Sequence, residues 1–399
     1  MSKTRFFDNE FVGCEKLEDI IVGNGENANI KESCKRQLKT ALLQMVHDIE
    51  RASHSFEKND ISVYTGISGY ALLYLHLYKI FQDEKYIETA QKYITSALKR
   101  LKGRRMTFLC GDAGPLAIGA VVYHTLGRKE DSKTCVNNLL AMLESVLPLD
   151  QEIYNEMLYG RAGYLYSLLY VRKHVENSGI KDEAINRVIH SIIESGKLTA
   201  SNKQSAALSY AWHGSEYIGA AHGYIGILYT LLCTNYQTYQ DDIKSTIDFV
   251  LGIQYPSGNF PSSFGSDNDR LIHWCHGAPG GVYLMMKAHE IFGEEKYLES
   301  ACKASDTVWN RGLLKKGYGI CHGTSGNGYG FLALYKYTKD AKYLYRAVQF
   351  GLWCCGYRER HGLNTPDRPY SLFEGIAGAA YFLADLLSPN NAKFPAFEL

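Results

Sequence analysis

Seven stretches of the chain are apolar over most of their length, and each begins with the spacing Gly-x-x-Gly. Examples are YALLYLHLYKIF, YLYSLLYV, YIGILYTLL and AAYFLADLL. Because these stretches lack a polar face, each is expected to form a helix that is buried on most sides. Glycines three positions apart share one face of a helix and let another backbone come close, so close packing alone explains them. The glycine pairs are Gly66/Gly69, Gly111/Gly114, Gly160/Gly163, Gly223/Gly226, Gly277/Gly280, Gly323/Gly326 and Gly375/Gly378.

A second pattern follows the apolar stretches and has one polar face. The segments DEKYIETA, EEKYLESA and DAKYLYRA begin at positions 83, 294 and 340, and their tyrosines fall 20 residues after the first glycine of the repeat. Polar residues such as Glu88, Gln91 and Lys92 mark the solvent face of an amphipathic helix. The repeating unit is therefore an apolar inner helix, a turn, an amphipathic outer helix and a longer loop.

Seven helical hairpins can form an open solenoid or a closed ring. An open solenoid needs polar caps at its ends, but the first and last repeats are as apolar as the middle ones. The pattern therefore predicts an all-α fold, a closed α/α toroid of seven inner and seven outer helices. We expect one domain over residues 1–399, with residues 1–55 fitting the pattern least. Closure would gather the glycine turns at one end, so residues 275–276 and 321–322 should be neighbours.

Charge and composition reduce the number of partners and locations to be considered. The formal net charge of +1 over 399 residues gives no reason to expect a nucleic acid or an anionic membrane as partner. No long uncharged apolar run predicts a transmembrane segment, and the polar start MSKTRFFDNE has no signal-peptide core. Without a secretory signal, the ten scattered cysteines are expected to be free thiols in a reducing compartment. A cytoplasmic location is expected, with peripheral membrane association left open.

Two of the glycine turns carry the same chemical groups. HWCHGAPGG at 273–281 and GICHGTSGN at 319–327 both place Cys-His before the first glycine. Two thiolates from Cys275 and Cys321 with one imidazole suit zinc, and three protein ligands leave a fourth position open, as in catalytic sites. Both His276 and His322 follow a cysteine, so spacing alone does not choose between them. Two unrelated buried cysteines beside polar turns are the alternative.

The chain resembles the lanthionine synthetase C-like proteins, especially their eukaryotic branch. The motifs that carry the resemblance are FLCGDAGPLA, LYGRAGY, GAAHGYIGI, HWCHGAPG, KKGYGICHG, TPDRPYSLFEG and the terminal FPAFEL. The resemblance implies an α/α toroid and one zinc held by Cys275, Cys321 and His322. It also implies a glutathione transferase that adds glutathione to dehydroalanine and dehydrobutyrine residues of proteins or peptides.

The resemblance further implies roles for several other residues. His222, which occupies the same place in its repeat as His276 and His322, is expected to donate a proton to the enolate left by thiol addition. Glu156 lies where the bacterial enzymes have an acidic residue, and is expected to assist. Glutathione is expected to contact Lys316, the Thr365-Pro366-Asp367 loop and Arg5. Asn364 stands where the family often has arginine, so that contact would lose a charge.

Two other functions remain open from the sequence. The first is a zinc-containing protein that binds glutathione and signalling partners without catalysis, since the family is also associated with such partners. The second is an α/α-barrel glycosidase using two of Asp112, Glu156 and Glu374, which need to face each other at about 5–10 Å. The glycosidase hypothesis leaves the Cys-Cys-His set unexplained.

Overall fold

The computed structural model describes residues 4–57, 59–150, 152–201, 206–360 and 366–399. The contacts between backbone positions divide the chain into two compact units. The first unit comprises Met1–Ser55, Gln254–Ser262 and Asp267–Pro395, and the second comprises Phe56–Ile253, Ser263–Ser266 and Ala396–Leu399. Both are helical: in the described residues the only sheet pairs β1 (Ile21–Val22) with β2 (Asn29–Ile30).

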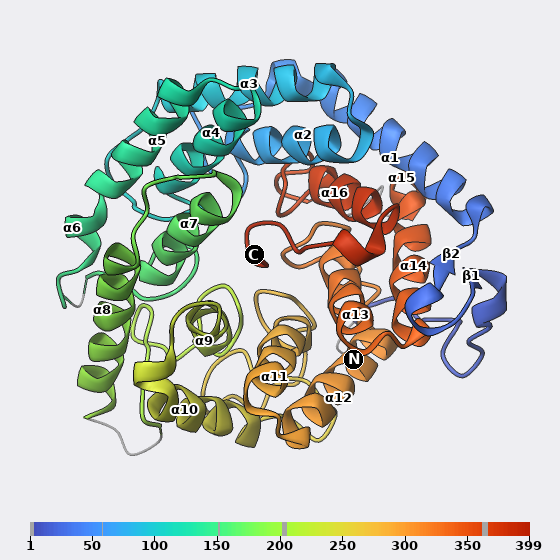
Figure 1. Ribbon diagram of the computed structural model, residues 1–399. Coiled ribbons are helices and arrows are strands. Elements are labelled where there is room, and N and C mark those ends of the chain that lie inside the picture. The colour runs from blue at the N-terminus through green and yellow to red at the C-terminus, as the bar shows by residue number, and fades with distance from the viewer. Residues whose placement is uncertain (1–3, 58, 151, 202–205, 361–365) are drawn as a thin grey trace. The chain divides into compact units, whose positions relative to one another are not determined.

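The second unit is built from four successive pairs of helices. One row consists of α2 (Ile67–Phe81), α4 (Ala113–Thr125), α7 (Arg161–His174) and α9 (Tyr224–Leu232). The other row consists of α3 (Glu84–Leu98), α5 (Lys129–Ala141), α8 (Asp182–Ala200) and α10 (Gln240–Gly252), with the short α6 (Leu143–Val146) after α5. Each helix of the first row packs against its successor in the chain and against the next helix of its own row (Figure 1).

The first unit contains three further pairs. They are α11 (Ala278–Phe292) with α12 (Glu295–Arg311), α13 (Thr324–Thr338) with α14 (Ala341–Cys355), and α16 (Ile376–Leu386) with α1 (Glu32–Ala52). The short α15 (Tyr357–Arg360) follows α14. The last apolar helix therefore takes its amphipathic partner from the start of the chain (Figure 1). The described residues thus hold the seven apolar and seven amphipathic helices that the repeats predict.

Short 3₁₀ turns complete the structure, at Leu17–Asp19, Gly25–Asn27, Ser53–Ser55, Gln237–Tyr239 and Pro389–Asn391. No helix among the described residues is both long and apolar enough to cross a bilayer.

Burial follows the two sequence patterns. All nine residues of α9 are buried, whereas α10 buries one side only, through Ile243, Thr246, Ile247 and Val250. The aspartate that begins the DEKY and DAKY motifs caps the amphipathic helix that follows it. Asp83 and Asp340 accept hydrogen bonds from the backbone N–H groups two residues later, which caps α3 and α14.

The glycine pairs mark a turn that folds back onto the helix it precedes. The first backbone N–H of α7 donates to Tyr154 O, seven residues earlier, and the same bond joins Tyr224 to Tyr217 before α9. At several glycines of these pairs a Cβ would collide with the backbone carbonyl six residues earlier, as at Gly163 with Met157 and at Gly326 with Ile320. Close backbone approach, which the sequence suggested, is therefore the reason for glycine at these positions.

This packing predicts a difference between two glycines of α13. Gly326→Ala should lower the free energy of unfolding by about 1–3 kcal/mol, because the added methyl group collides with the Ile320 carbonyl. Gly330→Ala is the matched control, since its Cβ would meet nothing closer than 3.9 Å. The control should be neutral or stabilise the helix by up to about 1 kcal/mol. Urea unfolding followed by circular dichroism measures both, and equal midpoints for the two variants would contradict the packing argument.

Candidate metal centre

The candidate metal centre lies in the first unit, on the turns that precede α11 and α13. The Cys275 N–H donates to Cys321 O at 3.3 Å, and the Cys321 N–H donates to Phe373 O at 2.8 Å. These bonds hold successive glycine turns side by side. Residues 275 and 321 are therefore neighbours, as the repeat register predicts.

The side chains of Cys275, Cys321 and His322 meet at this place. One ligand atom from each lies within 4.8 Å of the other two, and no other group of three such residues is found among the described residues. Both cysteines are buried and His322 is half-buried. Two sulfur atoms and one imidazole nitrogen form a donor set that suits a soft or borderline divalent metal. His276 is not part of this set, so the geometry favours His322 as the third ligand.

The protonation equilibria at this centre are shifted by burial and by the groups themselves. Burial, followed by the neighbouring Cys275 thiol, raises the pKa of Cys321. For His322, burial acts to lower the pKa, but the adjacent Cys321 more than offsets this, so the pKa is raised. Thiolates at such a buried place need a compensating positive charge, which is what a bound metal cation supplies.

Buried asparagines hold the two turns in place. The Asn259 carbonyl oxygen accepts from the first N–H of α11, at 2.7 Å, and its amide nitrogen donates to Leu271 O. The Asn327 amide on α13 donates to Ile272 O at 3.0 Å and to Gly312 O at 2.9 Å. Gly277 has φ +119, a conformation that a residue with a Cβ would adopt only under strain. Sequence analysis missed both asparagines, because nothing in their spacing connects them with the cysteines.

The terminal FPAFEL motif contributes a buried ring to the same unit. Phe394 is fully buried and stacks on Trp274, the residue before Cys275, with 5.1 Å between ring centroids. It also packs against Phe373, whose carbonyl accepts the Cys321 N–H. The terminal segment therefore supports the backbone of both cysteine turns, a role that the motif itself did not reveal.

Two cations expected to contact glutathione belong to this unit. The Arg5 carbonyl accepts from the Lys315 N–H at 3.0 Å, which places Arg5 beside the chain that leads into Lys316. Burial first, and then the charges of His322, Lys316 and Arg5, lower the pKa of His273, which lies 5.9 Å from His322 between ring centroids. Arg5 and Lys316 therefore act electrostatically on the residues around the candidate metal centre.

The loop expected to contact glutathione is described only in part. Pro366 lies near the backbone of Gly317, and Asp367 is exposed. Asn364 and Thr365 lie outside the described residues.

His222 and Glu156 belong to the second unit and are hydrogen-bonded to each other. His222 Nδ1 lies 2.8 Å from Glu156 Oε2, and the Glu156 carboxylate also accepts from the N–H groups of Leu158 and Tyr159. Because this bond is made at Nδ1, Nε2 is the ring nitrogen that points away from Glu156. The imidazole stacks on Trp212 with 4.0 Å between centroids and 5° between planes. Trp212 lies outside the repeats, so no sequence pattern pointed to it.

Two of the three carboxylates offered for a glycosidase, those of Asp112 and Glu156, are occupied by hydrogen bonds within the protein. Asp112 is buried and accepts from the N–H groups of Lys102 and Gly103. Glu156 is held as just described. Both carboxylates satisfy loop backbones, which is a structural task.

Comparisons with known proteins agree with the motifs. A family model described as "Lanthionine synthetase C-like protein" matches residues 57–399. The chain is 42% identical over 409 residues to "Glutathione S-transferase LANCL1" of Danio rerio, covering 100% of both chains. It is 33% identical to "LanC-like protein GCL1" of Arabidopsis thaliana, covering 87% of this chain and 83% of the relative.

Among solved structures, the chain is similar to "Nisin cyclase", with a TM-score of 0.62 and 17% sequence identity. The match covers 89% of this chain and 94% of the other. At this identity the likeness concerns the fold, and it confirms the all-α, α/α-toroid class predicted from the repeats.

The ligand set predicts the effect of removing one thiol. Losing a residue that only orients a metal ligand typically weakens metal binding roughly 10–100-fold. Cys275→Ala removes a ligand itself, so it should weaken zinc binding by a larger factor. Metal content after dialysis, measured by inductively coupled plasma mass spectrometry, checks this. Cys354→Ala is the control, since it removes a similarly buried thiol that lies outside the set. Both variants should keep the helical circular dichroism of the wild type, and one retained zinc per chain in Cys275→Ala would show that the ligand assignment is wrong.

Proposed function

The chain belongs to the lanthionine synthetase C-like family, and we propose that it is a zinc-dependent glutathione transferase acting on dehydroalanine and dehydrobutyrine residues of proteins or peptides. The observation that carries the proposal is the meeting of the Cys275, Cys321 and His322 donor atoms within 4.8 Å. The positive charges of Arg5 and Lys316 contribute to lowering the pKa of His273, which lies beside His322. The name of the zebrafish relative, a glutathione S-transferase, supports this reaction class.

Zinc is the metal that best suits this set of residues. Two cysteines and one histidine leave a fourth coordination position, as in catalytic zinc sites. A thiol that coordinates zinc is deprotonated outright, whereas an isolated thiol with a pKa of about 8.5 is mostly protonated at neutral pH. The protein residues supply the remaining tasks, which are to bind glutathione and to move a proton.

Glutathione carries two carboxylates, and the cations of the first unit are their proposed partners. Arg5 offers a planar fork of N–H donors and Lys316 a single ammonium group. Both approach the site from backbone segments that are hydrogen-bonded to each other, at Arg5 and Lys315. Pro366 and Asp367 complete the proposed glutathione contacts, together with Asn364 and Thr365, which lie outside the described residues. Asn364 offers hydrogen bonds without a charge.

The proposed reaction is a conjugate addition followed by protonation. The glutathione thiolate forms a bond to the β-carbon of the dehydroamino acid, and the electron pair of the double bond moves to give an enolate. The imidazolium form of His222 then delivers its Nε2 proton to the α-carbon, which leaves a neutral imidazole with its remaining proton on Nδ1, and solvent restores the proton at Nε2. Glu156 fixes the tautomer and the ring orientation by accepting from Nδ1. Mass spectrometry of a dehydroalanine peptide incubated with glutathione and the protein tests the proposal, the expected result being a mass gain equal to one glutathione.

Replacing His222 should separate proton delivery from metal and thiol binding. His222→Ala should keep zinc and glutathione binding but slow adduct formation by about 10²–10⁴-fold, the range for a lost general acid. His190→Ala is the control, because it removes an exposed histidine of α8 that is hydrogen-bonded to the Tyr239 hydroxyl. Adduct rates against glutathione concentration give the comparison. A wild-type rate in His222→Ala with zinc bound would make His222 a packing residue, with His276 or water as the next candidate donor.

Replacing Lys316 should act on glutathione affinity instead. Lys316 is exposed, so Lys316→Ala should cost only about 0.5–1.5 kcal/mol of binding free energy, below the range for a desolvated charge contact. Lys315→Ala is the neighbouring control, because its ammonium group donates to Thr4 and lies over the Phe7 ring. Isothermal titration with glutathione measures both variants. Equal affinities for wild type and Lys316→Ala would remove Lys316 from the glutathione site.

The same assays address the non-catalytic alternative. Zinc and glutathione binding without adduct formation on any dehydroalanine or dehydrobutyrine peptide would favour a binding protein over an enzyme.

A further inference from the structure

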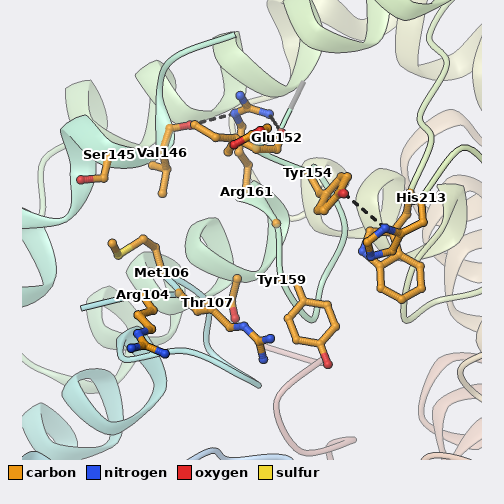
Figure 2. A pocket seen from close by; sticks show the side chains of 14 residues that line it. Arg104, Met106, Thr107, Ser145, Val146, Glu152, Tyr154, Tyr159, Arg161 and His213 are labelled. Carbon is orange, nitrogen blue, oxygen red and sulfur yellow. Dashed lines mark hydrogen bonds between the residues drawn. The ribbon is translucent and has the colours of Figure 1, made fainter. Parts of the chain in front are cut away.

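A cavity that shares no lining residue with the candidate metal centre lies wholly within the second unit. Its volume is about 550 Å³. The walls come from the loop after α3, from α6, from the loop that leads into α7 and from the turn at Trp212 and His213 (Figure 2). None of the residues proposed above to bind zinc or glutathione lines it. Its size falls within the range of ordinary ligand sites.

The cavity has an unbalanced positive charge. Arg104 and Arg105 line it and are exposed, and neither forms an ion pair with a described residue. The one carboxylate among the described lining residues is that of Glu152. The Arg105 guanidinium lies over the Tyr159 ring, 4.6 Å from its centroid, which limits the directions it can take. Two guanidinium groups therefore remain available to an anionic ligand.

The third arginine of the cavity, Arg161, stabilises the cavity wall and does not offer its donors to a ligand. Arg161 is fully buried and donates to the carbonyl oxygens of Val146 and Ile153 at 2.8 and 2.6 Å, and also to Pro148 O and Asn155 Oδ1. Burial lowers its pKa to about 10, so it stays charged at neutral pH. Its donors hold the end of α6 and the loop that leads into α7, and Figure 2 shows the bond to Val146 at the top of the view. Arg161 makes the cavity rigid and leaves recognition to Arg104 and Arg105.

Aromatic side chains connect this cavity to His222. Tyr154, Tyr159 and Trp212 all line it. The Trp212 ring also stacks on the His222 imidazole at 4.0 Å, and the Tyr159 ring lies 6.1 Å from it at 14°. The cavity wall and the proposed proton donor thus share two rings. A chain bound in the cavity would bring its neighbouring residues next to His222.

We propose that this cavity is the subsite for an acidic residue, aspartate or glutamate, that flanks the dehydroamino acid of a peptide substrate. The inference rests on the proposed function, because it assigns the second substrate of that reaction. A carboxylate matches the planar N–H fork of arginine, and the aromatic walls offer apolar contact to the rest of the peptide. An inorganic anion would leave those walls unused. A peptide segment uses both the charge and the rings.

The test compares two peptides that differ only in charge. Both contain one dehydroalanine, and one carries glutamate while the other carries glutamine at the two positions on either side. The wild type should favour the glutamate peptide in kcat/KM by on the order of threefold to tenfold, mostly through KM, and raised salt should weaken this preference. In Arg104→Gln/Arg105→Gln the ratio of the two kcat/KM values should fall to about one. Arg105→Lys should retain part of the preference, because it keeps the charge and loses the fork.

Arg128→Gln is the matched control. It removes the same charge from an exposed arginine of the second unit that pairs with Asp131 and does not line the cavity, so the preference should persist. An unchanged preference in the double variant, or equal kcat/KM for both peptides in the wild type, would overturn the subsite and leave the transferase proposal standing.

A binding assay separates failure of the subsite from failure of the enzyme. Fluorescence anisotropy measures the two peptides with alanine in place of dehydroalanine and without glutathione. Tighter binding of the glutamate peptide to the wild type than to the double variant supports the subsite even if no peptide is turned over. Equal binding of the two peptides to the wild type contradicts it. Competition by inorganic phosphate alone, with no preference between the peptides, would show a site for small anions and would also overturn the proposal.

Discussion

The first turns of most buried helices are closed by backbone carbonyls of the chain that precedes them, and this contact helps to determine where the candidate site residues lie. The loop before the helix folds back so that its carbonyl groups approach the first two turns and accept the N–H groups that a helix start leaves without partners, as at Tyr154 with Arg161. Only a residue without a Cβ fits under those carbonyls, hence the two glycines at Gly160 and Gly163. Backbone contacts therefore hold the residues immediately before these glycines in position.

Cys275, Cys321 and His322 use positions of this kind on neighbouring turns. Their ligand atoms are brought within 4.8 Å by backbone hydrogen bonds and by two buried asparagine amides. Burial makes the site costly for thiolates without a cation, which is evident in the raised pKa of Cys321. Ligand atoms held in place by such hydrogen bonds would lose little freedom on binding a metal, which suits the proposed zinc site.

The second unit uses the same type of turn for a different purpose. His222 also precedes the first glycine of its repeat, but its partner is the Glu156 carboxylate, itself held by the N–H groups of Leu158 and Tyr159. Stacking on Trp212 restricts the remaining rotation of the imidazole ring. Arg161 donates hydrogen bonds to four acceptors between Val146 and Asn155, in the segment that leads to Glu156. These bonds make the surroundings of the proposed proton donor His222 rigid.

The sequence by itself determined the helix types, their number and the register of the repeats, because buried and half-buried helices impose different periodicities on apolar residues. It also indicated Cys275 and Cys321 as neighbours, since equivalent places in successive repeats lie side by side. Spacing left His276 and His322 equal, and in the structure the His322 side chain, rather than that of His276, lies with the two cysteines, because the direction of a side chain depends on the turn that carries it. Asn259, Asn327, Trp212 and Phe394 reach their partners across long sequence separations and follow no period. The same holds for the pairing of α16 with α1 and for the cavity at Arg104 and Arg105, since contacts between distant segments exist only once the chain has packed.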